Sequence, residues 1–217
     1  MILISHSRRP QRGFTLIELL TVIAIMAILA GAAAPALMKS YRASSLTQAG
    51  NQVANLASLA RNNALSRNAM TALVIVTSTS ANLSQAANKA LTVIELAPGQ
   101  LNWTQITKWV FLPIQVKAYA NPAALDPANL PLPTGGAMPP LSVADNSGSL
   151  VALQSSDYVC YVFNPDGTMY NVSSPLPQAF VQYATDQAPS NGTQSTSLLN
   201  YYDLVFSEAG GIHIIRP

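Results

Sequence analysis

The 217-residue chain carries few charges, since charged residues make up 9% of it against 49% hydrophobic residues, and its formal net charge is +2. Removal of Arg8, Arg9 and Arg12 would leave eight basic residues against nine acidic ones, so the bulk of the chain lacks the strongly basic character of a nucleic-acid-binding domain. The length allows one globular domain beside an N-terminal segment. Because Cys160 is the only cysteine, an internal disulfide is excluded.

The N-terminal region consists of a short basic segment followed by a long apolar run. Residues 12–20 read RGFTLIELL, and no charged side chain occurs from Leu19 to Met38. A helix needs about 20 mostly apolar residues to cross a bilayer, so this run is long enough to span one. Glu18 lies at its start, where a charge costs on the order of 2.5 to 3.5 kcal/mol. Such a carboxylate is expected to have a partner.

Two ordinary explanations compete for this region. The first is a cleaved secretory signal, with the arginines as its basic start and small-residue cleavage sites at residues 30–32 or 32–34. The second is a plain membrane anchor. Neither accounts for Gly13, Phe14 and Glu18 together.

The residues 12–38 resemble the N-terminus of the type IV pilin superfamily. The resemblance implies that a prepilin peptidase cleaves after Gly13 and that the new N-terminal Phe14 is N-methylated. It also implies that Glu18 pairs, during assembly, with the N-terminal amine of a neighbouring subunit, which would select the register of helix packing. Pro35 stands where pilins commonly carry a helix-kinking proline.

Beyond Pro35 the helix is expected to continue as an amphipathic segment over residues 39–68. Small and apolar residues recur at helical spacing: Leu46, Ala49, Gly50, Val53, Leu56, Ala57, Ala60 and Ala64. The sequence of residues 59–68, followed by the apolar run 71–76, is similar to that of proteins in the GspH/FimT-like minor-pseudopilin branch. A narrower similarity to Verru-Chthon cassette proteins of type D rests on residues 12–20 and 211–217.

Short β-branched or aromatic runs bounded by turn formers predict an antiparallel meander after the helix. The expected strands are residues 71–77, 91–96, 108–116, 158–163, 168–172, 179–183, 198–206 and 212–216. Residues 164–167, which read NPDG, and residues 208–211 are expected to form tight turns. The expected fold class is therefore α+β, with a long N-terminal helix packed on an antiparallel sheet.

Two polar segments interrupt this pattern, at residues 78–90 and 118–149, and both are expected to be surface loops. The second is rich in proline and alanine and is unusually long for a compact domain. It is either a partner-facing insertion or a tolerated insertion without a partner.

The sequence offers no catalytic constellation, and we expect neither enzymatic activity nor a cofactor. His213 is expected to be a solvent-facing strand residue, and Cys160 a small buried hydrophobe. Asp157, Asp166 and Asp203 show no calcium-ligand spacing, so no metal site is expected. DNA binding would need several cations close together, and nothing in the sequence places the five candidates near one another. These candidates are Arg61, Arg67, Lys89, Lys108 and Lys117.

These observations predict a leader at residues 1–13, a membrane-spanning or filament-core helix at 14–38, an amphipathic continuation at 39–68 and a β-rich head at 69–217. The resemblance implies a structural minor pilin or pseudopilin of a type II secretion or type IV pilus-like filament. Its partners would be the prepilin peptidase and N-methylase, other pilin subunits and the inner membrane, without nucleic acid. The N-terminus would be cytoplasmic and the head periplasmic or extracellular. The alternatives are a DNA-binding minor pilin for DNA uptake and a signal-anchored exported binding domain.

Overall fold

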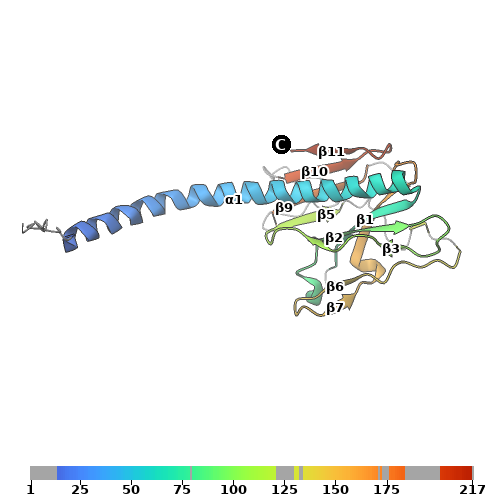
Figure 1. Ribbon diagram of the computed structural model, residues 1–217, viewed down its shortest axis with the longest axis horizontal. Coiled ribbons are helices and arrows are strands. Elements are labelled where there is room, and N and C mark those ends of the chain that lie inside the picture. The colour runs from blue at the N-terminus through green and yellow to red at the C-terminus, as the bar shows by residue number, and fades with distance from the viewer. Residues whose placement is uncertain are drawn as a thin grey trace, which may run out of the picture. The chain divides into compact units, whose positions relative to one another are not determined.

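The computed structural model describes residues 14–78, 80–120, 130–131, 134–170, 172, 176–183 and 201–216. The chain divides into two compact units, Met1–Ala43 and Ser44–Pro217. One helix, α1 (Leu16–Arg67), precedes all described strands (Figure 1). The strands are β1 (Met70–Val76), β2 (Ala90–Leu96), β3 (Thr104–Gln105), β4 (Val110–Phe111), β5 (Val116–Ala120), β6 (Ser142–Ala144), β7 (Leu150–Ala152), β8 (Tyr158–Phe163), β9 (Gln178–Tyr183), β10 (Tyr201–Phe206) and β11 (Ile212–Ile215). The expected long helix and antiparallel sheets are confirmed.

The second half of α1 buries the stripe that the periodicity predicts. All eight stripe residues are buried, from Leu46 to Ala64, while Gln48, Asn51 and Asn55 are exposed. Small side chains allow close approach of the helix to the sheets: a Cβ added at Gly50 would lie 2.6 Å from the ring of Tyr202 on β10. Figure 1 shows this half of α1 running beside strands of both sheets.

The strands form two main antiparallel sheets rather than the single meander that we expected. One follows the order β3-β2-β1-β8, with β4 also paired to β2, and the other follows β11-β10-β9-β5. The meander is wrong because β8 pairs with β1 and β9 pairs with β5, across long stretches of chain. The hairpin β6-β7 forms a separate two-stranded sheet.

The first sheet is buried on both faces. Leu73, Val93 and Tyr161 face α1 and belong to the same core cluster as the helix stripe. On the opposite face, Val74, Ile94 and Cys160 belong to a second cluster. Its cover comes from Trp103, Leu130 and Leu141.

The two segments expected as surface loops therefore contribute to the core. In the described part of residues 118–149, Leu130 and Leu141 cover the first sheet, and Val143 of β6 packs with Leu83 from the segment 78–90. Residues 121–129 and 132–133 of the predicted insertion lie outside the described residues. The segment resembled a loop because its buried apolar residues are isolated between prolines and polar residues.

Two predicted strands differ in extent. The predicted strand 108–116 is divided into β4 and β5, with Pro113 between them, since proline cannot donate a ladder hydrogen bond. The run 168–172 forms no described strand, and it contributes a single bridge between Phe163 and Met169.

The predicted turns at residues 164–167 and 208–211 are held together by a helix side chain. Gly167 and Gly210 both adopt positive φ, at 79° and 73°. Arg61 of α1 donates hydrogen bonds to the carbonyl oxygens of Gly167 (3.1 Å) and Ala209 (3.2 Å). Because these turns belong to different sheets, Arg61 joins both sheets to the helix.

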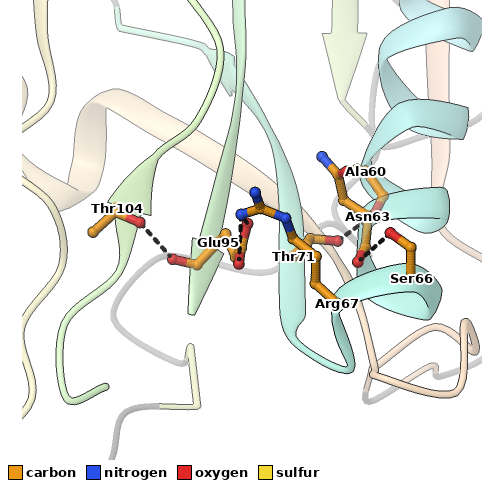
Figure 2. Close-up of polar contacts among 7 residues, drawn as sticks. All are labelled: Ala60, Asn63, Ser66, Arg67, Thr71, Glu95 and Thr104. Carbon is orange, nitrogen blue, oxygen red and sulfur yellow. Dashed lines mark hydrogen bonds and ion pairs between the residues drawn. The ribbon is translucent and has the colours of Figure 1, made fainter. Parts of the chain in front are cut away.

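A second helix arginine forms an ion pair with the first sheet (Figure 2). Nη1 of Arg67 lies 2.9 Å from Oε2 of Glu95, whose side chain is 2% exposed. Thr71 strengthens this junction by donating a hydrogen bond of 2.6 Å to the carbonyl oxygen of Ala60. The end of α1 is therefore fixed to β1 and β2 by polar contacts.

Replacing Arg67 with alanine is expected to destabilise the protein by about 1 to 3 kcal/mol, because the buried Glu95 carboxylate loses its partner. The side chain of Arg67 is 61% exposed, so the loss of stability should be smaller than for a fully buried ion pair. Thermal unfolding of the full chain in detergent measures this loss. Adding Glu95→Gln to Arg67→Ala removes the orphaned charge and should restore part of the stability; a double variant no more stable than Arg67→Ala would contradict this explanation.

Asp203 is a buried carboxylate in the second sheet. It alternates with Tyr202 and Leu204, which face α1, so its side chain lies on the opposite face of the sheet. The residue is 4% exposed, and no described residue forms a hydrogen bond with its Oδ1 atom. Burial raises the pKa of Asp203 from 3.8 to about 6.

We expect Asp203→Asn to stabilise the protein at pH 7.5 by about 1 to 3 kcal/mol. A carboxyl whose folded pKa is raised keeps the fold most stable below its unfolded pKa, and this stability is lost as the pH rises from about 4 to about 6. The advantage of the asparagine variant should thus be constant above pH 6.5 and should shrink toward pH 4. Unfolding midpoints of the wild type and of Asp203→Asn, measured across this pH range, test the expectation. A difference in stability that does not depend on pH would show that the carboxylate is not desolvated.

Candidate functional site

The N-terminus of α1 begins with a reciprocal capping arrangement between Thr15 and Glu18. Oε2 of Glu18 accepts hydrogen bonds from the backbone nitrogen and the hydroxyl of Thr15, both at 2.8 Å. The Thr15 hydroxyl oxygen in turn accepts a bond of 3.3 Å from the backbone nitrogen of Glu18. This is a capping box, in which the side chains at the start of a helix satisfy donors that the helix leaves free. It fixes the position of the Glu18 carboxylate.

The capping box leaves half of the carboxylate available. The described hydrogen bonds of the Glu18 side chain all end on Oε2, and none within the described chain reaches Oε1. A cationic group from outside this chain can therefore approach Oε1 without breaking the cap. The local bonds also reduce the cost of placing this carboxylate in an apolar environment, since hydrogen-bonded charges are less costly to bury.

Sequence reasoning identified Glu18 but missed Thr15. The signal was present as a threonine followed three residues later by a glutamate, just before an apolar run. Glu18 was interpreted only through its charge, so its local role at the helix N-terminus was overlooked.

The first unit presents an apolar surface around the capped end. Large hydrophobic side chains from Phe14, which is 88% exposed, to Met38 are open on the described helix. The helix is long and apolar enough to cross a membrane by length and composition. A soluble protein rarely exposes such a surface, so this segment needs lipid or other helices around it.

Two predicted site residues are described only in part. Gly13 lies outside the described residues, as does the whole predicted leader 1–13. Pro35 lies within α1, where the helical backbone continues, and its side chain is outside the described part. The assigned roles of Gly13, Phe14, Glu18 and Pro35 thus stay predictions.

Two of the five cations considered for DNA binding have partners within the chain. Arg61 donates to two turn carbonyls, and Arg67 forms the ion pair with Glu95. Lys89 is partly buried, and this burial is the main cause that lowers its pKa. Repulsion from the charge of Lys117 lowers the pKa further. The structure therefore gives the two arginines structural roles.

The candidate calcium ligands have separate local roles. Asp157 accepts hydrogen bonds from the Ser78 hydroxyl and the Gln154 backbone nitrogen. Asp166 accepts from Thr168 within its turn, and these bonds lower the pKa of Asp166. Among the described residues, no three acidic, histidine or cysteine side chains gather as metal ligands. His213 is exposed on β11.

Comparison with known proteins connects the N-terminal site to a family. The family model described as the prokaryotic N-terminal methylation motif matches residues 8–34. No curated protein matches the chain. The crystal structure of the type IV minor pilin FimU of Pseudomonas aeruginosa (strain PAO1) is similar, with 14% identity and a TM-score of 0.42 over 80% of this chain and 93% of that chain. The N-terminal segment of this chain thus carries the prokaryotic N-terminal methylation motif, at the start of a long apolar helix that precedes antiparallel sheets.

Proposed function

We propose that this chain is a structural minor subunit of a type IV pilus-like or type II secretion filament. The prepilin peptidase would cleave the chain after Gly13, and the N-methylase would methylate Phe14. These two steps would prepare the chain for assembly. The observation that carries the proposal is the methylation motif at residues 8–34, together with an exposed apolar helix whose capped Glu18 has one carboxylate oxygen that no described residue bonds.

The proposed assembly contact joins two subunits. The amine of a processed Phe14 would approach Oε1 of Glu18 on a neighbouring helix, within the apolar surroundings that the exposed side chains provide. In such surroundings the attraction between opposite charges is stronger than in water, and an unpaired charge is costly. Pairing would therefore favour one register of helix packing over others.

The proposed location is a bacterial inner membrane, crossed once, before assembly. Three arginines precede the span, which favours a cytoplasmic N-terminus and places the head on the periplasmic or extracellular side. Residues 14–38 would cross the membrane or form the filament core, and residues 39–68 would join them to the β-rich head at 69–217. In this arrangement the buried stripe from Leu46 onward anchors the head to the helix.

Incorporation into a filament tests the proposal. The full chain, carrying an epitope tag after Arg216, is produced in its own host, and surface filaments are sheared off and separated from membranes. We expect the tagged chain in the filament fraction, or cross-linked to other pilin-like subunits in the inner membrane. The alternative result is a chain recovered only from membranes, absent from the filament fraction and cross-linked to no pilin-like subunit. That result would favour the signal-anchored binding domain.

DNA uptake remains the alternative function of a minor pilin, and no contact among the described residues favours it. Arg61 and Arg67, its strongest candidates, hold the helix to the sheets. A subunit that uses these arginines for its own fold has them less available for phosphates.

A further inference from the structure

A cavity of about 420 Å³ opens on the surface of the head. Three segments that lie far apart in sequence form it: the turn before β2, the end of β4 with the link to β5, and the end of β6. Its volume lies within the range of ligand-binding cavities. Its main lining residues are Gln85, Lys89, Phe111, Leu112, Ile114 and Asp145.

One side of this cavity is apolar and open to solvent. Phe111 is 47% exposed and Ile114 is 86% exposed, whereas Leu112 between them is buried in the core. Leu150 of β7, which is 77% exposed, lies directly opposite Ala144, another residue of the cavity wall. Exposed hydrophobic side chains that gather around a cavity, unlike singly scattered ones, mark an interaction site.

The other side of the cavity carries a cation and an anion in different electrostatic situations. No described residue forms a hydrogen bond or an ion pair with the ammonium group of Lys89; burial and then repulsion by Lys117 lower its pKa, and no nearby anion offsets them. Oδ1 of Asp145, in contrast, accepts bonds from the backbone nitrogen (2.8 Å) and hydroxyl (2.7 Å) of Ser147 and from the backbone nitrogen of Ser149 (2.9 Å). The charge that lacks a counterpart in this cavity is therefore positive.

We propose that the cavity binds a segment of a partner protein in which an acidic residue lies next to a large apolar residue. The carboxylate of this segment pairs with Lys89, and its apolar side chain packs against Phe111 and Ile114. The exposed Leu150 extends the apolar contact beyond the cavity itself.

The remaining groups favour a polypeptide over a fatty acid or a nucleic acid. A peptide supplies N–H donors for Asp145 and Gln85 beside its carboxylate, whereas a fatty acid has no such donor and a polyanion is repelled by Asp145. The backbone nitrogen of Leu112 donates to the carbonyl oxygen of Lys89 at 2.9 Å. Because hydrogen bonding alternates along an antiparallel strand, the backbone groups of Phe111 point away from β2, where no described residue bonds to them. They can pair with a peptide backbone.

A peptide array tests the requirement for an acid. It presents short alanine-based peptides in which Asp, Glu, Asn, Gln or Lys precedes Phe, Leu or Ile. The probe is the full chain in lipid nanodiscs whose scaffold protein carries a dye, and empty nanodiscs control for binding by the lipid. Acidic peptides should retain about five- to tenfold more of the chain than their amide counterparts, because only a carboxylate forms an ion pair with the ammonium group.

Variants assign this preference to the cavity. Lys89→Met removes the ammonium group but keeps an apolar chain of similar length, and it should abolish the preference for acids over amides. Lys108→Met is the matched control, since this exposed lysine does not line the cavity, and it should keep the preference. Ile114→Ser should weaken retention of all the peptides about threefold or more, whereas Leu101→Ser, which is 52% exposed outside the cavity, should not.

Three results would each overturn the proposal. The first is equal retention of acidic and amide peptides by the wild type, and the second is an equal loss of the preference in Lys89→Met and Lys108→Met. The third is displacement of the chain from acidic peptides by hexanoate as effectively as by the same peptide in solution, which would show that the cavity takes small acids. Because the isolated chain is used, these results do not depend on its processing or its incorporation into a filament.

Discussion

Replacing Glu18 with alanine is expected to abolish incorporation of the chain into filaments while leaving its membrane insertion and cleavage intact. Alanine removes a charge from the apolar span, so insertion should be at least as efficient as in the wild type. In the assembled helices, however, the amine of Phe14 would lose its partner. An unpaired buried charge costs about 3 to 5 kcal/mol, which corresponds to a loss of incorporation by a factor of hundreds to thousands.

Alanine at this position also removes the capping box, so a matched variant is needed to separate the two roles. Glu18→Gln retains an oxygen that can accept the hydrogen bonds of Thr15 but carries no charge. Both variants should insert, and both should fail to incorporate if the charge is what matters. Membrane-fraction blots report insertion, and cross-linking to other pilin-like subunits reports incorporation. Normal incorporation of the glutamine variant would contradict a pairing of Glu18 with the amine of a neighbour.

The second large effect concerns the junction of the two sheets. Gly210 adopts a φ of 73°, and a Cβ built there would collide with the carbonyl oxygen of Gly167 and lie 2.9 Å from Nε of Arg61. Gly210→Ala is therefore expected to destabilise the head by about 2 to 5 kcal/mol. Roughly 1 to 2 kcal/mol comes from the left-handed backbone and a further 1 to 3 kcal/mol from the steric clash.

Gly148 supplies the control for this variant. Its φ is 86°, but a Cβ placed there meets nothing within 4 Å. Gly148→Ala should thus cost only the backbone contribution, about 1 to 2 kcal/mol. Thermal unfolding of both full-length variants in the same detergent compares them directly. Equal destabilisation would mean that the turns at Gly167 and Gly210 are not held in close contact.

The helix could be predicted from the sequence because its signals are local. A buried stripe from Leu46 to Ala64 repeats at helical spacing, and the charge-free run before it is visible in the sequence alone. The motif around Phe14 and Glu18 is equally local. The predicted limits of strands β1, β2, β8 and β9 lie within one residue of the observed ones, since each strand is rich in β-branched or aromatic residues and lies between turn-forming residues in the sequence.

Strand order and side-chain pairing depend on contacts between distant residues, which single-sequence patterns do not contain. Arg61 bonds to carbonyls 106 and 148 residues further along the chain, so its role in joining the sheets could not be predicted. Glu95 is likewise paired with an arginine 28 residues before it. The short strands β3, β4, β6 and β7 contain too few residues to show a period of two.

The mass and N-terminal sequence of the protein purified from the membrane of its own host test the central claim most directly. If the chain is processed as a pilin, the polypeptide begins at Phe14, and its intact mass exceeds that of residues 14–217 by one methyl group, about 14 Da. A polypeptide that begins near Ala33 or Pro35 would show instead that the apolar run is a cleaved secretory signal, and an unprocessed N-terminus would show that it is a plain anchor. Either of these two results would contradict assembly as a processed pilin-like subunit.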